Sequence, residues 1–283
     1  MRTAGIIVLI TVLGLSFTSP ATVIGAEHDG SWRQRVSSAD AEVIRDDVRE
    51  EVTFGREIAA RMVGRYGLYD NGQITRYVNL VGKTIALSTN RPELEFHFGV
   101  LNTDEINAYA APGGYVFVTR GALMKMQDES ELAGVLAHEI GHIVERHVVK
   151  ELNIHGTEGS ASSGLARLIG GGSDAARLAF YQSVDKALDI LFKTGYKRDD
   201  EVQADRDALM FCALAGYDPA GLIRYFERLS AAKGKNTEVL DKTHPSYETR
   251  ITWFKATMAD EGMDPGAFKT FKERFAEVAK IAK

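Results

Sequence analysis

The order of apolar and polar residues along the chain predicts a mostly helical protein. Between residues 37 and 67, apolar residues recur every three or four positions, which is the spacing of one buried helix face. Residues 70–87 repeat this pattern and predict a second helix. In the C-terminal half the same spacing predicts five more helices, at residues 175–194, 199–215, 219–232, 246–258 and 265–282.

After the second helix, the spacing of the apolar residues changes. Residues 94–101 alternate between apolar and polar or small side chains, which predicts a half-buried strand with His97 on its solvent side. Two further strands are predicted at 106–110 and 115–119, on either side of a Pro-Gly-Gly turn at residues 112–114. We therefore expect one small sheet among the helices.

The next helix carries most of the candidate chemistry. Asp128, with Glu131 three residues later, is an N-terminal capping pattern, and the apolar residues predict a helix that continues unbroken to about Leu152. This helix is apolar nearly all round, which predicts that it is buried. The predicted fold class is α+β: a single, mostly helical domain with a small β-sheet beside this helix.

The first residues have the pattern of a targeting segment. A basic residue precedes an apolar run at residues 4–17, and small residues then lead into a charged stretch. This order is typical of a signal peptide, with cleavage expected after Ala26 or after Ala21. The alternative is an uncleaved membrane anchor, which the shortness of the apolar run disfavours. We therefore expect residues 1–26 to be removed and residues 27–283 to form the mature domain.

Residues 153–174 are rich in Gly and Ser and separate two groups of motifs. Such a segment is either a plain linker or a flexible lid over a cleft. The sequence leaves both interpretations open.

The composition of the chain limits its partners. The 283 residues are 45% hydrophobic and 26% charged, as is ordinary for a soluble protein. The formal net charge of −5 predicts no nucleic-acid partner. After the N-terminal run, no apolar stretch approaches the length of about 18 residues that a bilayer requires, so no membrane span is expected in the mature chain. The only cysteine, Cys212, lies in a predicted helix and is interpreted as a small buried residue.

The stretch AHEIGHIVERH, residues 137–147, indicates a metal site. His138 and His142 are four residues apart, so on a helix both imidazoles project from one face and can bind one ion. Imidazole nitrogens suit zinc. Glu139 is turned about 100° away around the helix, which is too far for a comfortable ligand but near enough for a general base acting on a water molecule. This is the HExxH pattern of zinc peptidases.

The third ligand has to come from another segment. His147 lies about 140° around the same helix from His142, so we interpret it as a surface or packing residue. Farther along the chain, KRDDEVQADRDAL places Glu201 and Asp205 one helical turn apart. Glu201 is the expected ligand. Asp205 is expected to accept the ring N–H of His138 and thereby to fix the orientation of that imidazole.

Four motifs, in their order along the chain, resemble a known family: NAYAAPGGYVFVTRGAL, ESELAGVLAHEIGHIVERH, EVQADRDAL and THPSYETRI. Over roughly residues 40–260 the chain is similar to the gluzincin metallopeptidases of the HtpX, BepA and LoiP kind, which are relatives of the CAAX prenyl protease. The resemblance implies a zincin-type metallopeptidase fold and one zinc ion, Zn(2+), per chain. It implies His138, His142 and Glu201 as the zinc ligands and Glu139 as the catalytic base.

The resemblance also assigns a substrate strand. It implies that the strand after the Pro-Gly-Gly turn lines the cleft and pairs with an extended peptide through backbone groups. Gly114, Tyr115, Val116 and Phe117 would form this strand. Asn107, before the turn, is a candidate for bracing the site.

Two residues of the last motif are further candidates. The resemblance brings His244 close to the zinc, either as a movable, inhibitory fourth ligand or as a donor to the tetrahedral oxyanion; the alternative is a capping or packing role. Arg250 either stabilises negative charge or pairs with a carboxylate, and the pairing is the preferred interpretation.

These features predict an exported zinc endopeptidase, periplasmic or secreted, that hydrolyses unfolded or misassembled polypeptides, in envelope quality control by analogy with the family. The alternative is a zinc-stabilised periplasmic chaperone or assembly factor in which His244 keeps the metal site closed. A purely structural zinc module would leave Glu139 without a role. The motifs specify neither the natural substrate nor the oligomeric state.

Overall fold

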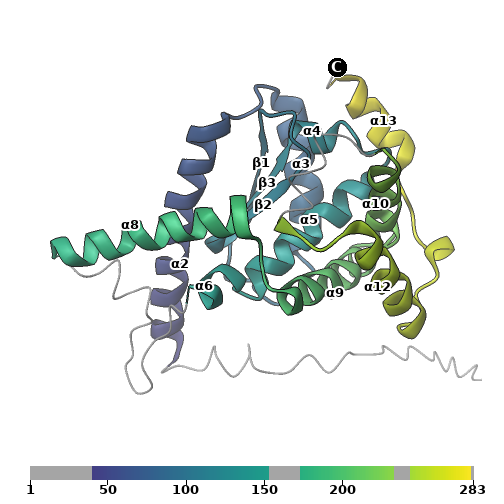
Figure 1. The fold of residues 1–283 in the computed structure, drawn as a ribbon. Coiled ribbons are helices and arrows are strands. Elements are labelled where there is room, and N and C mark those ends of the chain that lie inside the picture. Colours follow the sequence, from purple (N-terminus) through teal and green to yellow (C-terminus); the bar gives the residue numbers. More distant parts are fainter. Residues whose placement is uncertain (1–39, 153–172, 233–242, 282–283) are drawn as a thin grey trace, which may run out of the picture.

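The computed structural model describes residues 40–152, 173–232 and 243–281 of the chain. The predicted signal peptide lies outside the described residues, and so does nearly all of the Gly/Ser-rich segment considered as a linker or lid. The described part consists of one small sheet with helices on both of its faces (Figure 1). The predicted mostly helical α+β fold is confirmed.

The sheet has three strands, which are β1 (His97–Leu101), β2 (Ala108–Ala111) and β3 (Tyr115–Thr119). Their order is β1-β3-β2. β2 and β3 form the predicted antiparallel hairpin, in which Ala110 lies opposite Val116, and β1 runs parallel to β3, with Phe98 beside Val116. β3 is therefore the central strand, paired on both sides, and β2 is an edge strand.

The longer helices are α2 (Asp40–Tyr66), α3 (Gly72–Ala86), α5 (Glu129–Val144), α8 (Asp174–Asp189), α9 (Arg198–Leu214), α10 (Gly221–Ala231), α12 (Tyr247–Asp260) and α13 (Lys272–Ile281). One face of the sheet, with Val116 and Val118, packs in the same core as α3 and α5. The other face, with Tyr109 and Phe117, packs with α2 and α8. The sheet thus lies between two helical layers (Figure 1). Among the described residues, no helix has the length and apolar character needed to cross a bilayer.

The helices α5 and α9 are the elements that carry the candidate ligands, and they cross at close range. The side chain of Asp128 caps α5 by accepting a hydrogen bond from the Glu131 backbone N–H at 3.0 Å, as the sequence predicts. A Cβ atom at Gly141 of α5 would lie only 3.1 Å from the Cα of Ala204 in α9. Two small residues at this crossing therefore bring polar side chains of both helices within reach of each other.

The predicted unbroken helix to Leu152 is wrong. α5 ends at Val144, Arg146 takes a left-handed conformation with φ 57°, and a short helix, α6 (His147–Glu151), starts after it. The Arg146 guanidinium lies 3.2 Å from the buried carboxylate of Glu51 in α2, which holds the turn in place. This long-range ion pair compensates for a backbone conformation that costs a non-glycine residue free energy.

The helix predicted over 265–282 is also wrong in its first half. A single 3-10 turn at Pro265–Ala267 precedes α13, and the segment between them is not helical. The carbonyl oxygen of Thr270 in this segment accepts hydrogen bonds from the N–H groups of Glu129 and Ser130 at 3.1 and 3.2 Å. The segment therefore satisfies backbone donors at the start of α5 that have no partner within the helix.

Asp207 of α9 faces Gly141 of α5 and is the basis of a stability prediction. Burial, together with nearby Glu145, raises the pKa of Asp207 from 3.8 to about 7, and its Oδ2 atom has no hydrogen-bond partner within the described chain. The folded state therefore binds the Asp207 proton more tightly than the unfolded state does. As a consequence, the free energy of unfolding falls as the pH rises from about 4 to about 7. Asp207→Asn is expected to raise the free energy of unfolding at pH 8 by roughly 1–3 kcal/mol and to change it little near pH 4.

Urea unfolding at both pH values measures this difference. Asp199→Asn, at an exposed acid in the first turn of the same helix, is the control, and it should not raise the free energy of unfolding at either pH value. The expected link between the protonation of Asp207 and stability would be contradicted if Asp207→Asn lowers the free energy of unfolding at pH 8, or changes it equally at both pH values.

Candidate metal centre

His138 and His142 direct their ring nitrogens to one point. Both side chains are buried in α5, and their Nε2 atoms lie 3.1 Å apart. The two rings meet edge to face, with centroids 4.7 Å apart. The spacing of four residues on one helix, together with the burial of that helix, produces this convergence.

Glu201 reaches the same point from α9. Its Oε2 lies 3.7 Å from His138 Nε2, and its Oε1 lies 3.7 Å from His142 Nε2. His244, from the segment before α12, places its Nδ1 2.8 Å from Glu201 Oε2. The four ligand atoms all lie within 4.8 Å of one another. Ligands that share one zinc-sized ion are roughly 3–4 Å apart, so the cluster fits a single metal ion.

Burial and neighbouring charges set the protonation states that a metal requires. Burial, with a smaller effect of Arg250, lowers the pKa of His138, and burial with His138 lowers the pKa of His142. Both imidazoles are therefore neutral, which is the form that binds metal. Burial alone would raise the pKa of Glu201, but the charge and hydrogen bond of His244 outweigh it and lower the pKa to about 2. Two neutral nitrogens and a carboxylate form a typical ligand set for a divalent transition metal.

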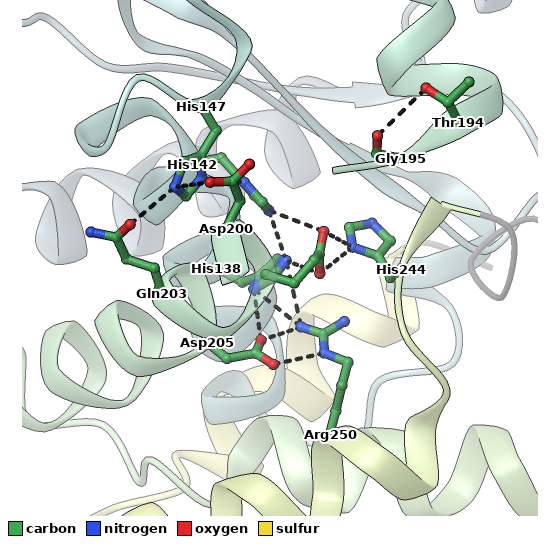
Figure 2. Close-up of polar contacts among 11 residues, drawn as sticks. His138, His142, His147, Thr194, Gly195, Asp200, Gln203, Asp205, His244 and Arg250 are labelled. Atoms are coloured by element: carbon green, nitrogen blue, oxygen red, sulfur yellow. Dashed lines mark hydrogen bonds and ion pairs between the residues drawn. The ribbon is translucent and has the colours of Figure 1, made fainter. Parts of the chain in front are cut away.

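Asp205 lies behind His138, on the side away from the cluster. Its Oδ1 is 2.8 Å from His138 Nδ1. Arg250 of α12 donates from Nε to Asp205 Oδ2 at 3.0 Å and also contacts Oδ1, so Arg250 pairs with a carboxylate (Figure 2). With its hydrogen on Nδ1 and donated to Asp205, His138 keeps Nε2 available for a metal.

His147 does not face away from the site, contrary to the sequence-based interpretation. Because Arg146 turns the chain, His147 is 0% exposed and its Nδ1 lies 2.8 Å from His142 Nδ1. The angle of about 140° assumed a continuous helix, and the helix stops three residues earlier. The available signal was the end of the apolar pattern at Val144, followed by three polar residues.

Tyr196 is a residue at the site that the sequence analysis did not single out. Its ring stacks on His142, with centroids 4.0 Å apart and an interplanar angle of 17°. Its hydroxyl is buried and has no hydrogen-bond partner among the described residues. Gly195, with φ 69°, precedes it, and a Cβ atom there would lie 2.0 Å from the Thr243 carbonyl oxygen. The glycine therefore lets the chain before α9 pass directly against the chain before His244.

Glu139 lines a small cavity next to the cluster. The cavity has a volume of about 20 Å³, and His138, His244, Arg250 and Asn107 are among its walls. This volume has room for about one water molecule. Burial raises the pKa of Glu139 to about 7, so its carboxylate exchanges a proton near neutral pH. The Asn107 amide nitrogen is buried, with no hydrogen-bond partner in the described residues.

The expected substrate strand is wrong. Tyr115, Val116 and Phe117 belong to β3, whose two edges are already paired with β1 and β2, and Gly114 lies in the turn before it. The edge strands are β1 and β2, and Ala108 at the start of β2 lines the cavity beside Glu139. The hairpin was visible in the local pattern, but the parallel pairing of β1 with β3 depends on a contact that the pattern does not contain.

Two histidines and a glutamate at one point, with a second glutamate beside a water-sized cavity, define a metallopeptidase centre of the HExxH type. The family model for peptidase family M48 matches residues 73–257, which include every residue of the cluster. The chain belongs to peptidase family M48, in agreement with the gluzincin resemblance of its motifs.

Similar proteins carry related names. The chain is 30% identical to the beta-barrel assembly-enhancing protease of Escherichia coli (strain K12), over 72% of this chain and 43% of that protein. It is 27% identical to metalloprotease YcaL of the same organism, over 79% of this chain and 82% of YcaL. It is 32% identical to the mitochondrial metalloendopeptidase OMA1 of Schizosaccharomyces pombe, over 62% of this chain and 51% of that protein. The chain spans half or less of the length of the beta-barrel assembly-enhancing proteases that it matches.

Proposed function

We propose that this chain is an exported zinc-dependent endopeptidase that hydrolyses peptide bonds of unfolded or misassembled polypeptides. The observation that carries the proposal is the meeting of His138, His142 and Glu201 at one point, with Glu139 beside it. Membership of family M48 supports the reaction class. The predicted signal peptide and the names of the relatives support action on envelope proteins, in the periplasm or after secretion.

The ligand set supports zinc as the metal, with His138, His142 and Glu201 as the residues that hold it. Two imidazoles and one carboxylate are the protein ligands of a known class of catalytic zinc sites. When bound, zinc supplies a Lewis acid that makes water more acidic and polarises a peptide carbonyl. Asp205 keeps the His138 ring in the orientation that binding requires.

Glu139 is proposed to move the proton during hydrolysis. Its carboxylate accepts a proton from the attacking water and returns it to the amine nitrogen of the leaving peptide. A pKa raised by burial to about 7 suits both transfers near neutral pH. The buried amide nitrogen of Asn107, in the same cavity, supports a role as donor to the carbonyl oxygen of the substrate.

The edge of β2 is proposed to bind the substrate as an added strand. The Thr119 N–H donates to the Asn107 carbonyl, so in the alternating antiparallel pattern Ala108 and Ala110 direct their backbone groups away from β3. Backbone pairing along this edge requires an extended chain but few particular side chains. This property suits unfolded polypeptides as substrates.

His244 is proposed to act as a latch that closes the metal site. Its Nδ1 lies 2.8 Å from Glu201, within the cluster, and a fourth protein ligand excludes the water that catalysis needs. A hydrogen bond to a charged group contributes roughly 1.5–3 kcal/mol, so His244→Ala is expected to raise the rate of proteolysis about 10–100-fold. The measurement is cleavage of a permanently unfolded protein and of a peptide library by the zinc-loaded chain 27–283.

The control is His97→Ala, at an exposed histidine outside the cluster, which should leave the rate unchanged. A slower His244→Ala variant would contradict the latch and favour a donor to the oxyanion. The observed contact between His244 and Glu201 also supports the second candidate, a zinc-stabilised chaperone with a permanently closed site. No cleavage by either form would favour this chaperone.

A further inference from the structure

His147 contacts the Nδ1 atom of His142 in the same way that Asp205 contacts the Nδ1 atom of His138. The HExxH pattern gives His147 no role, yet its Nδ1 lies 2.8 Å from His142 Nδ1 in the buried interior. On its other side, His147 Nε2 lies 3.4 Å from Gln203 Oε1 and 3.6 Å from Asp200 Oδ1 (Figure 2). His147 therefore connects α9 to the back of a candidate metal ligand.

The two close nitrogen atoms determine where the hydrogens are. His142 directs Nε2 toward His138 and Glu201, so this atom must carry no hydrogen if it binds a metal. The hydrogen of neutral His142 then lies on Nδ1, and His147 Nδ1 must accept it. Neutral His147 consequently carries its own hydrogen on Nε2, where Gln203 Oε1 is the acceptor and the carboxylate of Asp200 lies close by.

We propose that His147 is a positioning residue that holds His142 in its metal-binding tautomer, by accepting the Nδ1 hydrogen and donating its own to Gln203. The inference rests on the metal centre proposed above. It assigns His142 a neutral imidazole as partner, whereas His138 has the carboxylate of Asp205. The stacked ring of Tyr196 fixes the plane of His142, and His147 fixes its rotation within that plane.

A matched pair of substitutions tests the acceptor. His147→Leu has a similar size but no acceptor, whereas His147→Asn places an amide oxygen near the position of Nδ1. Loss of such a partner typically weakens metal binding 10–100-fold. We expect His147→Leu to raise the dissociation constant for Zn²⁺ by about this factor, and His147→Asn to remain within about fivefold of the unmodified chain. Competition with a chromophoric chelator measures the constants, and circular dichroism verifies folding.

Equal zinc affinity of His147→Leu and the unmodified chain would overturn the proposal, as would equal weakening by both substitutions, which would indicate packing alone. If His147→Leu does not fold, NMR of the unmodified, zinc-loaded chain with ¹⁵N-labelled histidine decides the question. The proposal requires hydrogen on Nε2 of His147, and hydrogen on its Nδ1 would overturn it. An unmodified chain that binds no Zn²⁺ would instead refute the metal centre, so the two failures are distinguishable.

Discussion

Glu139→Gln is expected to reduce kcat for peptide hydrolysis by about 10²–10⁴-fold, while the chain still binds one zinc ion. The amide has nearly the volume of the carboxylate, but it cannot accept a proton from water. Glu139 is outside the ligand cluster and lines the adjacent cavity, so the substitution removes the proton acceptor and leaves His138, His142 and Glu201 in place. Steady-state kinetics on an unfolded substrate and elemental analysis of the purified protein measure the two quantities.

A matched control is Glu145→Gln, at the glutamate that follows the last turn of the same helix and pairs with Lys150. It should retain both normal activity and normal zinc content. Glu139→Gln with activity within tenfold of the unmodified chain would refute the proton-transfer role. Loss of zinc in Glu139→Gln would instead indicate that Glu139 is a ligand.

Glu201→Gln is expected to remove zinc binding and activity together. An amide oxygen is neutral, so the substitution removes the only negative charge among the three proposed ligands. It also replaces the charged acceptor of His244 by a neutral amide oxygen, which weakens that hydrogen bond. The affinity for zinc should fall by more than the roughly 10–100-fold that loss of a hydrogen-bonding partner costs. Thermal unfolding with and without Zn²⁺ reports the same loss, because a ligand stabilises only a folded state that binds it.

The control for this prediction is Asp199→Asn, at an exposed acid two residues earlier on α9. The melting temperature of the control should rise with added Zn²⁺ as that of the unmodified chain does. The melting temperature of Glu201→Gln should not change. A zinc-dependent rise in Glu201→Gln equal to that of the control would place the third ligand elsewhere.

The parts of the site that the sequence predicted are those that depend on local spacing. His138 and His142 meet because four residues make about one helical turn, and this relation holds wherever the helix packs. Glu201 and Asp205 share the same spacing on α9, and they approach α5 where Gly141 meets Ala204. The helix pair could therefore be placed together once both motifs were identified.

The parts that were missed depend on contacts between distant segments. Arg146 has a left-handed backbone conformation, pairs with Glu51 of α2 and turns His147 toward the site. The local sequence pattern does not predict this ion pair. The order of strands in the sheet follows from the parallel pairing of β1 with β3, which moved the proposed substrate edge from β3 to β2. Tyr196 reaches His142 because Gly195 packs against Thr243, a contact between two loops.

The most direct test of the proposed metal centre is anomalous X-ray diffraction at the zinc absorption edge, on crystals of the chain grown with Zn²⁺. The proposed metal centre predicts one strong peak per chain, at about 2.0–2.2 Å from the Nε2 atoms of His138 and His142 and from a carboxylate oxygen of Glu201. A peak that lacks Glu201 as a neighbour, or a map without a peak between α5 and α9, would contradict it.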